Sequence, residues 1–312
     1  MSAPSPPTSD ASSTPNSLES TYNPSNKYYF SGKMIVLLVE KTSFRVHQDL
    51  LIRSSQIFAD TLMVPDGENN SQTLDGHPVI QLTDTEEEWD IFLDVFYGSV
   101  EADSLEDTSL GNVLRIANKY IFNKISKTCE SYLQQKVFPY DRTSGHWFSN
   151  YIPYVKIVLE HNLLYMMPQA FYEAASLEVT EIITLFKKTR PELLVKFLAG
   201  RDKIATVVAG FAADGISGFL EGGCTVQDES CSGIDAFLHY TTKMAPQWRT
   251  RYEPLAELQS IVSGAEIDRL CNTCREKVGQ ASVSFQAEIW ADLPSVFGLA
   301  ESWAELQKYR IE

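Results

Sequence analysis

The sequence predicts an α+β fold in its first half, followed by a mainly α-helical C-terminal domain. Two short apolar runs, at residues 34–39 and 44–46, flank a polar turn, which is typical of a β-hairpin. Apolar side chains then recur at helical spacing from His47 to Leu62, with Leu50, Leu51, Ile57, Phe58 and Leu62 expected on the buried side. The second half has helical periodicity at residues 151–175, 192–209, 256–290 and 299–309.

Several further elements complete the first half. Residues 1–26 are rich in Ser and Pro and poor in large apolar side chains, so we expect a disordered tail there. Residues 78–82 predict a third strand, and Thr83, Asp84 or Thr85 can cap the helix that follows it. That helix has an apolar stripe and is expected to end at Gly98, and two more helices are expected at residues 105–120 and 121–137. The stripe consists of Trp89, Phe92, Leu93 and Phe96.

The composition indicates a folded protein with an acidic surface. Hydrophobic residues make up 44% of the chain and charged residues 21%, with a net charge of −15. No run approaches the roughly 18 apolar residues that a transmembrane helix needs. The first twenty residues also lack the basic and apolar regions of a secretory signal. We therefore expect a cytoplasmic or nuclear protein without a membrane partner.

The acidic residues are concentrated in one stretch. Residues 54–114 contain 14 Asp and Glu residues and no Lys or Arg. Nucleic-acid binding depends on basic groups that contact phosphates, so we expect no direct nucleic-acid binding by this half. A solvated acidic surface is our main interpretation, and a patch that steers a basic partner is the alternative.

The hairpin and the helix after it resemble the opening of a BTB/POZ domain, in which an aromatic residue precedes a His, a Leu pair, a Ser and a Phe. The order of elements over residues 27–137 resembles the whole domain, and residues 138–312 would then form the helical domain. The resemblance implies a protein-interaction module that often self-associates and, in some members, recruits a cullin-type ubiquitin-ligase scaffold. The matching residues are Phe44, His47, Leu50, Leu51, Ser54 and Phe58.

Two departures from the BTB/POZ pattern leave dimerisation and cullin recruitment as open alternatives. Phe30-Ser31-Gly32 stands where dimerising members often have an Asp. Residues 98–101 lack the acidic motif that many cullin-binding members carry.

Four of the five cysteines lie in one region of the second half. Cys271 and Cys274 form a C-x-x-C pair at the start of a helical pattern, and six residues separate Cys224 from Cys231. Four thiolates from two pairs can close a tetrahedral zinc site of the structural kind. The alternatives are inert buried thiols, which need no cofactor, and a redox-active C-x-x-C.

The C-terminal segment has a distinctive apolar pattern. Together with the C-x-x-C helix, it resembles the tail of the BTB/POZ proteins expanded in basidiomycete fungi. We expect these side chains to form a packed cluster, and an exposed partner groove is the alternative. The pattern consists of Trp290, Leu293, Phe297, Leu299 and Trp303.

No nucleophile-elbow, phosphate-loop or zinc-protease motif is present, and the five histidines are scattered. We therefore expect a non-enzymatic adaptor or scaffold with protein partners. The alternatives are a zinc-stabilised regulatory protein that acts with a nuclear partner, and a ubiquitin-ligase substrate adaptor. An enzyme that uses Cys271 or Cys274 as a low-pKa thiolate is the third hypothesis.

Overall fold

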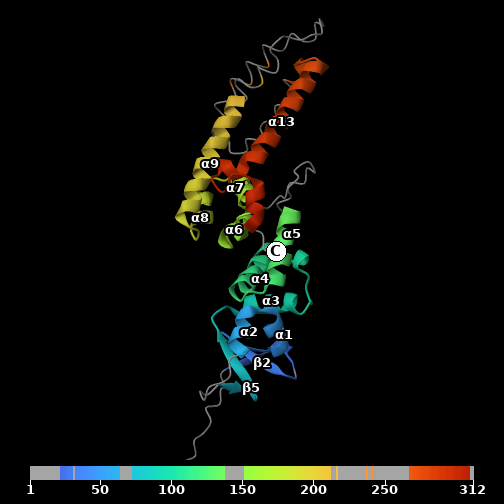
Figure 1. Ribbon diagram of the computed structural model, residues 1–312, viewed down its shortest axis with the longest axis vertical. Coiled ribbons are helices and arrows are strands. Elements are labelled where there is room, and N and C mark those ends of the chain that lie inside the picture. Colours follow the sequence, from blue (N-terminus) through green and yellow to red (C-terminus); the bar gives the residue numbers. More distant parts are fainter. Residues whose placement is uncertain are drawn as a thin grey trace, which may run out of the picture. The chain divides into compact units, whose positions relative to one another are not determined.

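The computed structural model describes residues 22–30, 32–63, 72–137, 151–211 and 267–309, with the single positions 216, 237, 241 and 243. The chain divides into two compact units, residues 1–129 and 130–312. Helix α5 (Asn123–Tyr132) runs through this division, which lies eight residues before the boundary expected at residue 137. Figure 1 shows strands and short helices in the first unit and only helices in the described part of the second.

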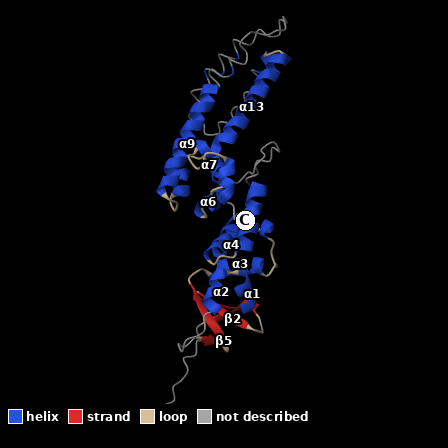
Figure 2. Ribbon diagram, viewed as in Figure 1, coloured by secondary structure: helices blue, strands red, loops and turns tan. Residues whose placement is uncertain are grey.

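The first unit is built on a five-stranded mixed sheet with the order β1-β3-β2-β5-β4. Strands β2 (Met34–Val39) and β3 (Thr42–His47) form the predicted antiparallel hairpin, and all residues of β2 are buried. Strand β5 (His77–Leu82) pairs in parallel with β2, and β4 (Thr73–Leu74) pairs antiparallel with β5. Because β2 has a paired strand on each side, its continuous apolar run is central to the sheet (Figure 2).

Strand β1 (Asn23–Tyr29) differs from the expectation of a disordered tail over residues 1–26. It pairs in parallel with β3 along one edge of the sheet, starting opposite Thr42. Most of its side chains are exposed, and only Tyr28 is buried. An edge strand needs little apolar surface of its own, which is why the polar composition of residues 23–26 concealed it. Residues 1–21 of the expected tail lie outside the described residues.

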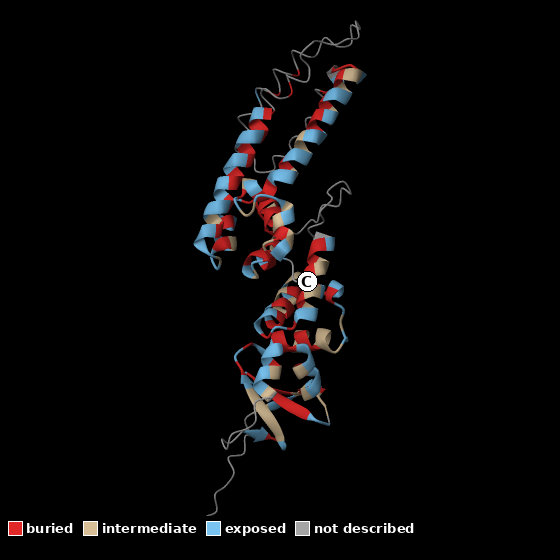
Figure 3. Cartoon of the chain, viewed as in Figure 1, coloured by how far each residue is buried: buried red, intermediate tan, exposed pale blue. Residues whose placement is uncertain are grey.

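The helical pattern predicted from His47 to Leu62 forms two short helices, α1 (Gln48–Ser54) and α2 (Gln56–Met63). Leu51 and Phe58 are buried, but the expected burial of Leu50 and Ile57 is wrong, because 39% and 38% of their surfaces are exposed. The helices are separated by an extended residue, Ser55, so one helical stripe does not continue in phase across both. Figure 3 shows that much of this helix pair is exposed.

Helix α3 (Glu86–Phe96) begins and ends as the sequence predicts. Thr85 is its N-cap, and the Thr85 and Glu88 side chains form a reciprocal capping box. Gly98 follows the helix with a φ of 75°, a conformation that glycine adopts without strain. The buried part of the stripe packs against α4 (Asp107–Lys119) and against aromatic residues of α2 and of the turn between α4 and α5. The rings in contact are those of Phe58, Trp89, Phe92, Tyr120 and Phe122.

The second unit is helical in its described part. Its helices are α6 (Ile152–Glu160), α7 (Met167–Ala174), α8 (Val179–Phe186), α9 (Pro191–Gly210), α13 (Asn272–Val296) and α14 (Trp303–Leu306). The two long helices α9 and α13 contact one another, and both are labelled in Figure 1. An aromatic core includes Phe197 of α9 and Phe297, which directly follows α13. Its rings are those of Phe171, Phe186, Phe197 and Phe297.

The C-terminal apolar segment forms a packed cluster, as predicted. Leu293 and Phe297 are buried, and the rings of Trp290 and Trp303 stack with centroids 6.1 Å apart. The Trp303 indole also donates a 2.9 Å hydrogen bond to the backbone oxygen of Trp290. These contacts dock α14 against α13, so this segment is core rather than an open groove.

Candidate protein-interaction site

A pocket of 420 Å³ opens beside the C-terminal end of α3 in the first unit. The end of α3, the turn after it and the start of α5 contribute most of its lining, and we call it the α3–α5 pocket. Its lining is mainly aromatic and aliphatic, a composition suited to receiving an apolar side chain. The lining includes Val95, Phe96, Tyr97, Val100, Phe122 and Ile125.

Two oppositely charged side chains also line this pocket. Glu101 comes from the turn after α3 and Lys124 from the first turn of α5, and both residues are exposed. Within the described residues neither charge has an ion-pair partner. The pocket therefore combines an apolar lining with a carboxylate and an ammonium that can each pair with an incoming group.

Tyr97 of the pocket lining is held by ring contacts and a hydrogen bond to residues from the sheet side of the unit. Its ring stacks on Tyr28 of β1 with centroids 5.5 Å apart, and it also contacts the rings of Phe30 and His47. Its hydroxyl oxygen accepts a 3.1 Å hydrogen bond from the His47 backbone N–H and lies 3.1 Å from His47 Nδ1. Burial raises the pKa of Tyr97, against the opposing effect of the His47 hydrogen bond.

Asp94 of α3 connects β1 to the turn that lines the pocket. Its carboxylate accepts a 2.5 Å hydrogen bond from the Tyr28 hydroxyl and one of 3.1 Å from Lys27, which also bonds Asp90 at 2.9 Å. Its backbone oxygen accepts hydrogen bonds from the N–H groups of Ser99 and Val100. Burial first, and then the bond to Asp94, raise the pKa of Tyr28, so this phenol is neutral and donates its proton.

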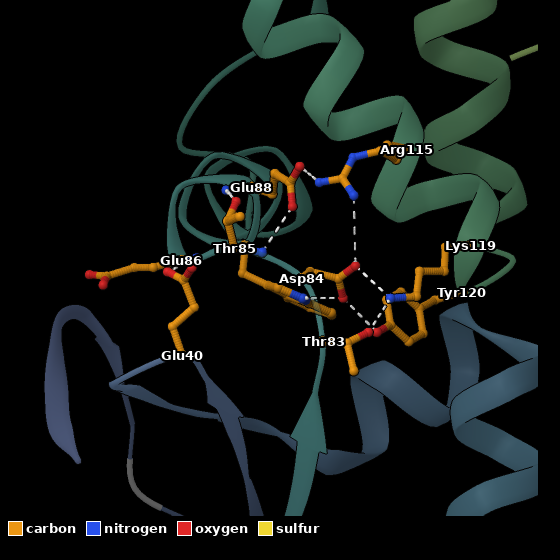
Figure 4. A network of polar contacts seen from close by, with 10 residues as sticks. Glu40, Thr83, Asp84, Thr85, Glu86, Glu88, Arg115, Lys119 and Tyr120 are labelled. Atoms are coloured by element: carbon orange, nitrogen blue, oxygen red, sulfur yellow. Dashed lines mark hydrogen bonds and ion pairs between the residues drawn. The ribbon is translucent and has the colours of Figure 1, made fainter. Parts of the chain in front are cut away.

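A second polar network holds α3 against α4 (Figure 4). Asp84 precedes α3, and only 1% of its side chain is exposed. Its carboxylate accepts hydrogen bonds from the Trp89 indole at 3.1 Å, the Tyr120 hydroxyl at 2.6 Å and the Lys119 ammonium at 2.6 Å. Burial acts to raise the pKa of Asp84, but the bonds from Lys119, Tyr120 and Trp89 outweigh it and lower that pKa.

These two networks correct part of our interpretation of the acidic stretch. Asp84 and Glu88 are buried, and Asp94 has only 14% of its side chain exposed, so they are not members of a solvated face. Their cationic partners lie outside the stretch: Arg115 pairs with Glu88, Lys119 with Asp84 and Lys27 with Asp94. The fold places basic side chains from outside the stretch next to these carboxylates, and a count of charges along the sequence does not show this pairing.

The six residues of the predicted BTB/POZ pattern do not meet at one place. Phe44, Leu51 and Phe58 are buried core residues, and His47 ends β3, where its ring contacts Phe30 and Tyr97. Leu50 and Ser54 are exposed on α1, and Ser54 lines the pocket.

Ser55 is a structural residue that the sequence analysis missed. Its hydroxyl oxygen accepts a 3.1 Å hydrogen bond from the N–H of Phe58, which caps α2, and its hydroxyl donates a 2.5 Å bond to the backbone oxygen of Tyr120. The available signal was a serine directly before a helix, at N-cap spacing from Phe58.

The cysteine pairs are described only in part. Cys271 is the N-cap of α13 and Cys274 lies in its first turn, and both are buried. Cys224 and Cys231 lie outside the described residues. In the described part of the chain, no group of three or more His, Cys, Asp or Glu residues is placed to hold a metal ion. The four-cysteine zinc site therefore stays a prediction.

One protein family matches part of this chain. The family model of the BTB/POZ domain matches residues 34–137, so this stretch of the chain is a BTB/POZ domain. BTB/POZ domains mediate protein–protein interaction. No curated protein and no solved structure matches the chain. None of the helices described here has the length and apolar character needed to cross a bilayer.

Proposed function

We propose that this protein is a non-enzymatic adaptor of the cytoplasm or nucleus, whose BTB/POZ domain self-associates through α1 and α2. The exposed surface of these helices carries the proposal. Leu50 on α1 and Ile57 on α2 expose 39% and 38% of their surfaces, although both are large aliphatic residues. Burying such side chains against a second copy would remove apolar surface from water, at roughly 25 cal/mol per Å².

The polar residues around them suit a symmetric interface. Arg53 is exposed on α1 and has no ion-pair partner within the described residues, and the exposed Asp60 lies on α2. In a two-fold interface, a contact between Arg53 of one copy and Asp60 of the other is repeated with the copies exchanged, so the same ion pair would form twice. An interface with an aliphatic centre and a charged rim follows from this arrangement.

Light scattering of the purified full-length protein tests self-association. We expect a dimer at tens of micromolar, and a monomer when Leu50→Asp and Ile57→Asp are combined. Val283→Asp is the matched control, because Val283 is 67% exposed on α13 in the other unit and should leave the dimer intact. Circular dichroism would show that all variants are folded. A wild-type protein that is monomeric at this concentration would contradict the proposal.

The α3–α5 pocket supports a second, heterotypic contact. We propose that it receives an apolar side chain from a protein partner, with Glu101 and Lys124 pairing with charges beside that side chain. A cullin-type scaffold is one candidate partner, in which case the protein is a ubiquitin-ligase substrate adaptor and the helical unit presents the substrate.

Calorimetric titration with a purified cullin N-terminal domain tests this assignment. Lys124→Glu should weaken binding about tenfold or more, because it reverses a charge at the pocket. Lys127→Glu makes the same change on the same helix at a residue that does not line the pocket, and it should change the affinity by less than about threefold. Equal effects of the two variants, or an absence of binding to the wild type, would reject the cullin as the partner.

A further inference from the structure

Strand β1 lies outside the residues that match the BTB/POZ family model, yet it contacts the pocket lining. The match begins at residue 34, whereas β1 spans Asn23–Tyr29 and is followed by Phe30. Tyr28 and Phe30 both contact the ring of Tyr97, which lines the α3–α5 pocket. These ring contacts therefore link a strand outside the matched residues to the lining of the candidate partner site.

Strand β1 is also connected to the pocket lining through hydrogen bonds of Asp94. Lys27 and Tyr28 both donate to the Asp94 carboxylate, and the Asp94 backbone oxygen accepts from Ser99 and Val100. Val100 lines the pocket. One end of β1 thus holds the ring of Tyr97 by stacking and the turn after α3 through Asp94.

Strand β1 lies at the edge of the sheet and buries little surface of its own. It is an edge strand whose pairing with β3 changes register between Pro24 and Tyr29, and Pro24 has no N–H to donate. Tyr28, 3% exposed, is its one buried residue. Elements with few buried contacts open at a low free-energy cost compared with the rest of a domain.

We propose that β1 is a positioning element for the α3–α5 pocket, with Tyr28 as the residue that fixes Tyr97 and the turn at residues 98–101. Docking of β1 holds the pocket in its binding shape, and release of β1 loosens this lining and weakens partner binding. This inference rests on the proposed function of the pocket as a partner site.

Amide hydrogen exchange of the full-length protein, followed by mass spectrometry, tests the coupling without any partner. In Tyr28→Ala, peptides covering residues 95–102 should exchange about tenfold faster, while peptides from α4 should be unchanged. Tyr28→Phe keeps the ring stack, so the exchange rate of the same peptides should stay within about twofold of the wild-type rate. Lys27→Gln, at a side chain that is 53% exposed, is a milder variant that should keep the fold and raise exchange in the same peptides.

Tyr29→Ala is the matched control on the same strand. The Tyr29 ring packs on Arg45, and its hydroxyl donates a hydrogen bond to Asp75. Tyr29→Ala should therefore leave the amide exchange of residues 95–102 unchanged. Unchanged exchange of residues 95–102 in Tyr28→Ala would overturn the inference, as would equal acceleration in α4 or an equal effect of Tyr29→Ala. Because exchange needs no partner, it also separates this inference from the proposed partner contact of the pocket, whose failure would appear in the binding titration.

Discussion

The Tyr120 hydroxyl donates a 2.6 Å hydrogen bond to Asp84 Oδ2. This bond joins the C-terminal end of α4 to the residue directly before the N-cap of α3. The other side of this contact is apolar, because the Tyr120 ring stacks on Phe58 with centroids 5.3 Å apart. Tyr120 therefore connects the aromatic core of the first unit to its buried anion. Lys119 and Trp89 complete the set of donors around Asp84.

Replacing Asp84 should destabilise the first unit. In Asp84→Ala the indole of Trp89 and the hydroxyl of Tyr120 lose their acceptor, so we expect the free energy of unfolding to fall by about 2–3 kcal/mol. Lys119 adds little to this loss because its side chain is 40% exposed and can be solvated. Urea denaturation measures the change, with the exposed Asp103→Ala as control. Equal effects of the two substitutions would show that the network does not contribute.

The lowered pKa of Asp84 predicts a loss of stability in acid. The unfolded chain binds a proton at Asp84 near pH 4, whereas the folded chain binds it only at lower pH. The stabilisation is therefore present above about pH 4 and is lost as the pH falls through the folded pKa. The difference in melting temperature between the wild type and Asp84→Asn should shrink from pH 6 to pH 3. A constant difference over this range would contradict the prediction.

The raised pKa values of Tyr28 and Tyr120 predict a loss of stability at alkaline pH. Burial and then the hydrogen bonds to Asp94 and Asp84 raise these values, so the folded chain keeps both phenols neutral. The unfolded chain ionises them near pH 10, so stability is full below that pH and falls above it. Tyr120→Phe should flatten the fall between pH 9 and pH 11 in chemical denaturation. An unchanged slope would show that Tyr120 titrates normally.

The local sequence pattern was sufficient to predict the β2–β3 hairpin and both ends of α3. The β2–β3 pair is a short-range unit, and both the cap at Thr85 and the end at Gly98 are set by neighbouring residues. β1 was missed because its pairing with β3 joins distant residues and its sequence is polar. The phase of α1 and α2 was wrong because a single extended residue, Ser55, resets the helical register.

The candidate site was less predictable than the fold. The α3–α5 pocket collects side chains from residues 54, 95–102 and 122–128, and nothing in any one of these segments marks a cavity. The donors to Asp84 lie up to 36 residues away, and Lys27 is 67 residues from Asp94. Such pairings depend on the tertiary fold, so sequence reasoning found the acids but not their partners.

Phe58 is a core residue whose truncation should be costly. It is 2% exposed and its ring contacts those of Trp89, Tyr120 and Phe122. We expect Phe58→Ala to lower the free energy of unfolding by about 3–5 kcal/mol, as the loss of apolar contacts and the resulting cavity add together. Thr61→Ala, on an exposed position of the same helix, should change it by less than about 1 kcal/mol. A loss below about 1 kcal/mol for Phe58→Ala in a denaturant melt would contradict this packing.

Gly200 and Gly210 of α9 offer a matched pair of substitutions with opposite expected signs. A Cβ at Gly200 would overlap the ring of Phe297, whereas one at Gly210 would meet no atom within 4 Å. Gly200→Ala should therefore destabilise the second unit by about 1–3 kcal/mol through overpacking. Gly210→Ala should stabilise it by about 0.4–1 kcal/mol, because alanine lowers the entropy of the unfolded chain. Thermal and urea unfolding of both variants measures the two effects, and a stabilising Gly200→Ala would show that Phe297 does not pack against α9 at this position.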